Sequence, residues 1–279
     1  MAADIRVGFS GWTFEAWRGD FYPKGLVQKR ELEYASRQVN SIEVNGTFYS
    51  LQKPESFQNW ASQVPEDFVF AVKAPQYITH VRRLKDCATP LHNFLASGPL
   101  SLGARLGPIL WQFPPNVTLK DDRFEKFIKL LPHTAKDAAK AAKKHDAKME
   151  GRAWTKVTGD FPVRHAFEFR HPSFNNADFL AFLKAHNVAA VMTHASARAP
   201  GFEEATADFV YLRFHGEGKG YAKGYPPAEI KEWAQRFRAW AKQGKPVFAY
   251  FGTEAKAYAP FDAVKMMQEL SAVPRKRAA

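Results

Sequence analysis

The stretch HAFEFRHPSF, residues 165–174, combines a strand pattern with charged side chains that a buried strand rarely holds. Phe167 and Phe169 alternate as on a strand with at least one buried face. Glu168, Arg170 and His171 lie between and after them, and such groups are costly to bury without partners. The stretch therefore predicts a strand whose carboxyl end lies among other charged groups.

Short apolar runs typical of strands alternate with amphipathic helical patterns along the whole chain. The expected strands are residues 5–9, 41–45, 68–73, 108–113, 165–170, 189–194, 209–215 and 247–251. Helical spacing of apolar residues occurs in the segments 57–64, 124–131 and 230–241. Pro226 and Pro227 fit the start of the last of these helices, and Asn175 or Asn176 fits the cap of another.

Strict alternation predicts parallel strands with right-handed crossovers, and eight such units favour an α/β fold of the (β/α)8 TIM-like barrel type. An open doubly wound sheet is the alternative, but GFSGW after the first strand lacks the GxGxxG spacing. The 279 residues fit a single barrel domain, residues 1–279. Residues 133–164 exceed what a crossover needs and predict an inserted Ala/Lys-rich helix, about 135–149, before the fifth strand.

The composition and the net charge indicate which partners and which cellular compartment to expect. The formal net charge of +12 favours acidic partners, although part of it lies in the Ala/Lys-rich segment and the PRKR tail. The single cysteine, Cys87, excludes a disulfide within the chain and has no motif around it, so we expect an inert thiol in a reducing compartment. No signal-peptide pattern or membrane-spanning run appears, and we expect a cytoplasmic protein without a membrane partner.

The polar residues of the expected strands share one phase. In the second strand Glu43 opposes Ile42 and Val44, and the third, fifth and seventh strands repeat this alternation. The outer face of a barrel strand meets helices and must be apolar, so the polar sets point inward, near the carboxyl ends where barrel enzymes keep their sites. A structural salt-bridge network is the alternative reading. The inward set comprises Glu43, Asn45, Lys73, Gln112, Glu168, Arg170, Arg213 and His215.

This set suits acid–base chemistry on an anion. Cations outnumber carboxylates in it, and arginine grips carboxylate or phosphate groups with two hydrogen bonds. We assign catalytic roles to Glu43, Lys73 and Glu168, as a carboxylate base beside a lysine acid or as a Schiff-base lysine, and the sequence leaves this choice open. Substrate-binding roles are expected for Asn45, Tyr49, His80, Gln112, Arg170, His171, Arg213 and His215.

The expected substrate is a small or polymeric anionic molecule, with a phosphorylated one favoured, and no cofactor is expected. A divalent metal held by Glu43, Glu168, His215 and His194 is a weaker alternative, because three nearby cations would repel it. A second alternative is a non-catalytic nucleic-acid-binding protein that uses the basic loops 79–85 and 217–224. The third is a metal-dependent nuclease or sugar isomerase, which rests on barrel analogy alone. The Gly- and Lys-containing loop GEGKGYAKGYPP, residues 216–227, fits a phosphate grip and a solvated loop equally.

Seven segments in order resemble the YecE-like family, also called domain of unknown function 72. They are GFSGW, EVNGTFY, FAVKAPQYITHVRRL, LGPILWQFPPN, EFRHPSF, DFVYLRFHG and VFAYF. The resemblance spans roughly residues 5–270 and implies a TIM-barrel-like fold without supplying an activity. The polar positions of the family pattern correspond to the inward set together with His80 and His171. MTHAS, residues 192–196, and FGTEA, residues 251–255, lack the Asp and Asn residues that the family often carries there.

Overall fold

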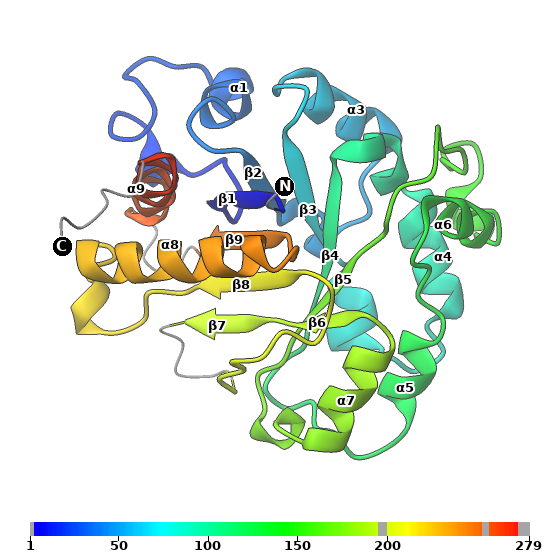
Figure 1. Ribbon diagram of the computed structural model, residues 1–279. Coiled ribbons are helices and arrows are strands. Elements are labelled where there is room, and N and C mark those ends of the chain that lie inside the picture. The colour runs from blue at the N-terminus through cyan, green and yellow to red at the C-terminus, as the bar shows by residue number, and fades with distance from the viewer. Residues whose placement is uncertain (1–2, 195–199, 253–256, 273–279) are drawn as a thin grey trace.

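The computed structural model describes residues 3–194, 200–252 and 257–272 (Figure 1). The changed segments MTHAS and FGTEA fall partly outside the described residues, and the PRKR tail falls wholly outside them. Within the described part, the strands are β1 Ile5–Phe9, β2 Ser41–Val44, β3 Val69–Lys73, β4 Leu106–Gln112, β5 His165–Glu168, β6 Val188–Ala190, β7 Met192–His194, β8 Val210–Phe214 and β9 Val247–Phe251. Every expected strand is present, with ends that shift by at most a few residues.

Helices or helical turns follow most of these strands and lie around them in Figure 1, but in the described ranges β6, β7 and β8 follow one another without a helix between them. The α-helices are α1 Glu31–Ala35, α2 Gly46–Tyr49, α3 Pro54–Ser62, α4 Ala88–Ala96, α5 Arg123–Ile128, α6 Ala135–Ala142, α7 Ala177–Ala185, α8 Pro227–Lys242 and α9 Ala259–Ser271. Short helical turns are η1 Glu15–Trp17, η2 Gln28–Arg30, the π-helical η3 Tyr77–Val81, η4 Pro99–Arg105, η5 Ala147–Met149, η6 Pro172–Phe174 and η7 Lys219–Tyr221. Asn176 caps α7 by accepting a hydrogen bond from Phe179 N, and α8 begins at Pro227, as predicted.

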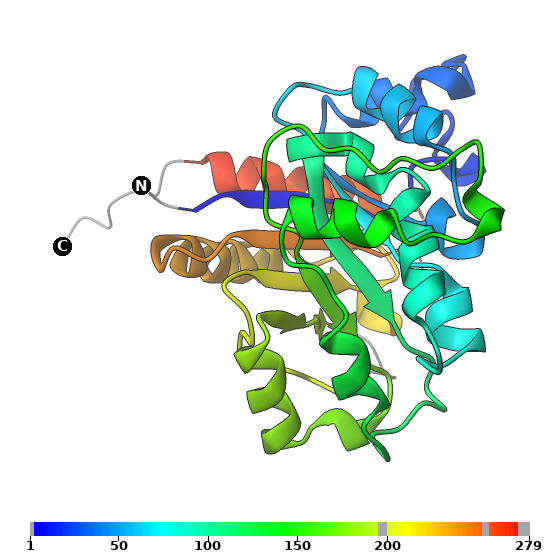
Figure 2. The same ribbon diagram turned by 90° about the vertical axis from the view of Figure 1, so that its right-hand side faces the viewer.

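The described strands form two parallel sheets, in the orders β1-β9-β8-β7 and β2-β3-β4-β5-β6. A closed eight-stranded ladder is not found among these residues, so the fold is α/β with parallel strands but the expected barrel closure is absent. The predicted strand 189–194 is divided at Val191: β6 pairs with β5, and β7 pairs with β8. One segment thus joins both sheets, whose strands cross at a steep angle in Figure 2.

The second junction lies between β1 and β2. The side chain of Asn40 accepts from Val7 N at 2.7 Å and donates to Ile5 O at 2.9 Å, so it occupies backbone groups that a neighbouring strand would use. At Gly8 the backbones approach so closely that an added Cβ would lie 1.8 Å from Ser41 O. Beyond this point Ser10 pairs with Glu43 as an isolated bridge. The two sheets therefore meet closely at this edge without a continuous ladder.

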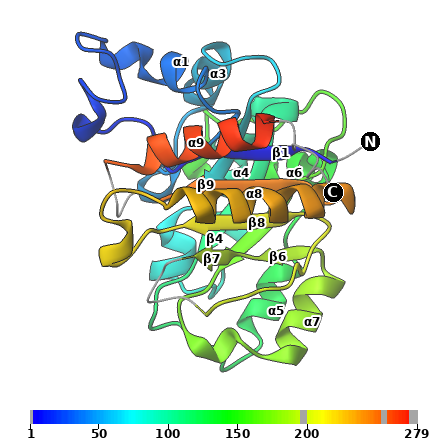
Figure 3. The ribbon, with the colours of Figure 1, turned by 60° about the vertical axis from the view of Figure 1, so that its left-hand side comes forward.

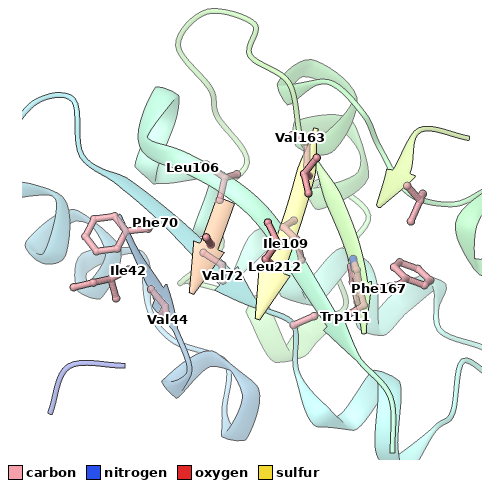
Figure 4. Close-up of a cluster of buried hydrophobic side chains, with 14 of the residues drawn as sticks. Ile42, Val44, Phe70, Val72, Leu106, Ile109, Trp111, Val163, Phe167 and Leu212 are labelled. Carbon is pink, nitrogen blue, oxygen red and sulfur yellow. The ribbon is translucent and has the colours of Figure 1, made fainter. Parts of the chain in front are cut away.

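A large apolar layer lies between the strands and the surrounding helices. Alternate residues of β2 to β5 and of β8 face this layer, as predicted from their phase; they include Ile42, Val44, Phe70, Val72, Ile109, Trp111, Phe167 and Leu212 (Figure 4). Helices α8 and α9 cover the side of the molecule formed by β1 and β9 in Figure 3. Since one face of each strand packs in this layer, the alternate residues of the strand face the space that the strands enclose.

A second, smaller cluster occupies the space enclosed by the strands. Its residues have the phase opposite to the outer layer; they are Ala71, Leu110, Ala166, Ala189, Val191, Ala207, Phe209, Tyr211, Phe248 and Tyr250. Glu43, Lys73, Glu168 and Arg213 share this inward phase and lie at or near the carboxyl ends of their strands. The enclosed space is thus apolar in its interior and charged near the carboxyl ends of the strands.

The Ala/Lys-rich segment forms a helix that is shorter than expected. Helix α6 ends at Ala142 and only the turn η5 follows, whereas the sequence predicted one helix to about 149. Asp146 interrupts the helix, because it caps η5 by accepting a hydrogen bond from Lys148 N and exchanges two 3.0 Å hydrogen bonds with Asn93 of α4.

Cys87 is buried, and burial raises its thiol pKa to about 11, which agrees with the expected inert thiol. No helix in the described ranges combines the length and apolarity needed to cross a membrane.

Candidate active site

Arg213 lies at the centre of the charged layer. The polar residues of this layer are called the mouth cluster; they are Glu43, Lys73, Gln112, Glu168, Arg170, Arg213 and His215. Arg213 Nη1 donates to Glu168 Oε2 at 2.6 Å, and Nη2 donates to Glu43 Oε1 at 2.9 Å. Both carboxylates are fully buried and Arg213 is 5% exposed. One guanidinium therefore joins carboxylates from β2 and β5, as the strand phase predicted.

Two hydroxyl groups complete the hydrogen bonds of the Glu43 carboxylate. Ser10 Oγ donates to Oε1 at 2.7 Å, and Tyr211 OH donates to Oε2 at 2.7 Å. Burial raises the pKa of Tyr211 well above its ordinary value, and the charge of Glu43 raises it further, so the phenol stays a donor. Sequence reasoning did not include Ser10 or Tyr211 in the site. Tyr211 was identifiable, because it shares the inward phase of Arg213.

Glu168 has more partners than Glu43. Gln112 Nε2 donates to Oε2 at 3.0 Å from the neighbouring strand, in register with Glu168. Arg170 Nη2 donates to Oε1 at 3.4 Å, and His215 Nε2 lies 3.4 Å from the same oxygen without forming a hydrogen bond. Burial opposes ionisation of Glu168, but the charge of Arg213 leads a group of cations that outweighs it and holds the pKa well below its usual range. Glu168 is therefore a carboxylate at neutral pH and a weak base.

Lys73 differs from the other charged members of the cluster. It ends β3 and is 9% exposed, and its Nζ lies 4.1 Å from the centroid of the Phe48 ring. Its amine has no hydrogen bond or ion pair with any residue in the described ranges. Burial, followed by the charge of Arg213, lowers the pKa of Lys73 to about 8. Phe48, which sequence reasoning missed, forms one wall around this amine.

The other expected binding residues surround this cluster in different ways. Asn45 follows β2, and its side-chain Oδ1 is buried with no hydrogen-bond partner among the described residues. His80 lies on η3 with its ring 5.0 Å from that of Phe48, and burial together with the charge of Lys73 lowers its pKa to about 4. Tyr49 is 72% exposed at the end of α2. His171 Nδ1 accepts from Ser173 N at 3.1 Å and caps η6, which gives it a structural role.

A cavity of about 660 Å³ lies beside the cluster. Helix α2, the turn η3, helix α4 and the turn η5 enclose it, and the exposed side chains Tyr49, Tyr77 and Val81 line it. Phe48 lines the cavity, and its ring also contacts the Lys73 amine. The cavity provides apolar surface next to the charged layer.

The four ligands of the weaker metal alternative do not come together. His194 lies on the outer face under α8, with its ring 5.1 Å from Trp233 and its Nε2 3.9 Å from Glu229 Oε2. It is therefore separated from Glu43 and Glu168 by the strand that carries it. Across residues 3–194, 200–252 and 257–272, no group of three or more His, Cys, Asp or Glu side chains is placed to hold a metal ion.

The two loops of the nucleic-acid alternative are partly engaged in local contacts. In the segment 79–85, Arg82 Nη2 donates to Asp86 at 3.3 Å, while Arg83 is exposed. In the segment 217–224, Tyr221 OH donates to Glu229 of α8 at 3.1 Å.

Comparison of the chain with known proteins identifies its family. The family described as "Protein of unknown function DUF72" matches residues 6–278. The chain belongs to the DUF72 family. UPF0759 protein YunF of Bacillus subtilis (strain 168) is 24% identical over 298 residues, which cover 95% of this chain and 94% of YunF. UPF0759 protein YecE of Escherichia coli (strain K12) is 30% identical over 123 residues, which cover 39% of this chain and 43% of YecE.

Solved structures support the same assignment of fold. A DUF72 family protein of Thermotoga maritima gives a TM-score of 0.73 at 24% identity and covers 96% of this chain and 100% of that one. D-Psicose 3-epimerase of Clostridium cellulolyticum, solved with D-tagatose, gives a TM-score of 0.53 at 14% identity and covers 95% of this chain and 98% of the epimerase. The DUF72 fold is therefore TIM-barrel-like, and at these identities the likeness concerns the fold alone.

Proposed function

We propose that this DUF72 protein is an enzyme that performs acid–base chemistry on a small anionic substrate, phosphorylated or carboxylated, at the mouth cluster. The observation that carries the proposal is the Lys73 amine, which is buried beside charged groups but has no anionic partner in the described ranges. A buried charge without a partner is costly, so a protein retains one mainly where a ligand completes the site.

The charge balance of the cluster supports an anionic ligand. Arg213 is shared between Glu43 and Glu168, and Arg170 makes one long contact with Glu168. The two carboxylates thus balance the two arginines, and the positive charge of Lys73 is left over. An anion that enters the mouth would find this charge together with the unused donors of Arg170, whose side chain is 20% exposed.

The proton-transfer role fits Lys73 better than either glutamate. A group transfers protons most effectively when its pKa lies near the working pH, and the pKa of Lys73 is lowered to about 8. Glu168, which the sequence also suggested as a base, is held ionised by Arg213 and its neighbours. We therefore assign Glu43 and Glu168 to holding Arg213 in place, and assign substrate contacts to Arg170 and Asn45.

The proposed function requires that the two sheets share one mouth. We treat residues 1–279 as one domain in which the two sheets act as a single (β/α)8 barrel with a shared mouth. The bridge between Ser10 and Glu43 and the division of one strand between both sheets support this view. The likeness in fold to D-psicose 3-epimerase supports the single-barrel architecture as an analogy.

Solvent-exchange NMR tests the proposal. The protein is incubated in D2O with triose, pentose and hexose phosphates, and the loss of carbon-bound proton signals beside the carbonyl group is followed. We expect exchange or conversion of at least one substrate in the wild type and none in Lys73→Met. Glu168→Gln separates the two assignments: retained exchange supports Lys73 as the proton carrier, whereas complete loss with an intact fold supports Glu168 as the base.

Nucleic-acid binding is a second candidate, favoured by the net charge of +12. Binding through phosphate contacts would weaken steeply with rising salt, because each contact releases counterions. Fluorescence anisotropy with generic single- and double-stranded DNA and RNA at several salt concentrations tests this candidate. Absence of binding at low salt would rule it out.

A further inference from the structure

We propose that Lys73 forms a Schiff base with the carbonyl carbon of its substrate, so that the substrate class is small carbonyl compounds that carry a carboxylate or phosphate group. This inference rests on the proposed function and deepens it from proton transfer to covalent catalysis. It follows from three features of the described residues: the isolation of the amine, its access to the mouth, and the cations that flank it.

The isolation of the amine favours its neutral form. Both carboxylates of the cluster are turned toward Arg213, and Lys73 Nζ instead lies against the face of the Phe48 ring. Thr47 Oγ1 donates to the backbone oxygen of Lys73 at 2.6 Å, which fixes the strand end that carries this side chain. Burial and the charge of Arg213 lower the pKa of Lys73 to about 8, so an appreciable fraction of the amine is unprotonated near neutral pH.

The amine nevertheless remains accessible to a ligand. Lys73 is 9% exposed, whereas Glu43 and Glu168 are fully buried. A substrate that enters from the mouth therefore reaches the amine before it reaches either carboxylate. Arg170, with a 20% exposed side chain and a single 3.4 Å contact to Glu168, has donors left for the anionic group of such a substrate.

The covalent step balances without any additional redox partner. The neutral amine attacks the carbonyl carbon, a C–N bond forms, and a proton passes from nitrogen to the former carbonyl oxygen to give a carbinolamine. A second proton, supplied by solvent at the mouth, lets that oxygen leave as water while the nitrogen lone pair forms the C=N bond. The protonated imine then draws electrons from the adjacent carbon, which favours loss of a proton or cleavage of a C–C bond there.

Borohydride trapping tests this inference. Sodium cyanoborohydride reduces a protonated imine to a stable secondary amine, so the protein is incubated with it and with pyruvate, glyoxylate or dihydroxyacetone phosphate in turn. Intact-mass measurement reports the adduct, and peptide mapping reports its position. We expect one adduct, located on Lys73, that is lost in Lys73→Met and retained in Lys143→Met, a change of the exposed lysine that directly follows α6.

The outcomes separate this inference from the function on which it rests. A carbonyl probe that stabilises the wild type but not Lys73→Met against heat, yet leaves no adduct on Lys73, overturns the Schiff base and preserves the anion site. Probes that neither stabilise the protein nor label Lys73 count against both. Labelling spread over surface lysines and unchanged in Lys73→Met also overturns the inference. If Lys73→Met fails to fold, peptide mapping of the wild type alone decides the position of the adduct.

Discussion

Arg213 and Glu168 form a buried ion pair with a 2.6 Å hydrogen bond, although 45 residues separate them in the chain. The strand phase brings them together, because β5 and β8 each direct alternate side chains into the enclosed space. The same guanidinium holds Glu43, so the geometry of the mouth depends on one side chain from β8.

Loss of Arg213 should therefore destabilise the fold strongly. In Arg213→Met two buried carboxylates lose their main counter-ion, and the free energy of unfolding should fall by about 3–5 kcal/mol. Urea denaturation at pH 7 measures the change. Arg170→Met is the matched control, since Arg170 is partly exposed and makes one long contact, and it should cost less than about 1 kcal/mol. Equal effects of the two substitutions would contradict the central role of Arg213.

The hydroxyl of Tyr211 should matter more than that of its neighbour Tyr250. Tyr211→Phe leaves a buried oxygen of Glu43 without its donor and should cost about 1.5–3 kcal/mol, because the acceptor is charged. Tyr250→Phe removes a neutral contact with Ser41 Oγ and should cost about 0.5–1.5 kcal/mol. Urea denaturation of both variants compares the two costs. A larger loss in Tyr250→Phe would contradict the assignment of Tyr211 to Glu43.

The pKa of Lys73 predicts a pH dependence of stability. Because the folded-state value of about 8 lies below the ordinary value of 10.5, the unfolded chain binds more protons between these two pH values. The wild type should therefore gain stability relative to Lys73→Met as pH rises from about 8 to about 10.5, by on the order of 3 kcal/mol at most. Paired denaturation curves across this range measure the gain. A difference that stays constant with pH would show that the pKa of Lys73 is not lowered.

The close approach of β1 and β2 predicts strict dependence on Gly8. The Cβ of Gly8→Ala would lie 1.8 Å from Ser41 O, so the junction of the two sheets must open and stability should fall by about 3 kcal/mol or more. Gly220→Ala is the control, since an added Cβ there has no neighbour within 4 Å, and it should change stability by less than about 0.5 kcal/mol. Thermal unfolding followed by circular dichroism distinguishes the two.

Strand positions and side-chain phase were predictable from the sequence because they depend on local alternation. That alternation placed Glu43, Glu168 and Arg213 on inward faces, and the hydrogen bonds of Arg213 confirm that they converge. The functional roles of these residues stay predictions. His194 was named as a ligand of the metal alternative without support from its phase, and it lies on the outer face against Trp233.

Features that depend on long-range contacts were not predictable. The junction at Asn40 uses side-chain hydrogen bonds to a strand more than thirty positions away, which no local pattern signals. The division of a continuous apolar strand at Val191 arises from pairing with two different neighbours. The contacts of Ser10 with Glu43 and of Phe48 with Lys73 likewise exist only once the strand ends meet.

The affinity of inorganic phosphate for the wild type and for Lys73→Met, measured by calorimetry at pH 7 and constant ionic strength, tests the central claim most directly. The account predicts saturable binding at one site in the wild type and in Lys143→Met, loss of that binding in Lys73→Met, and weaker wild-type binding as pH rises through about 8. Equal affinity in all three proteins would contradict it.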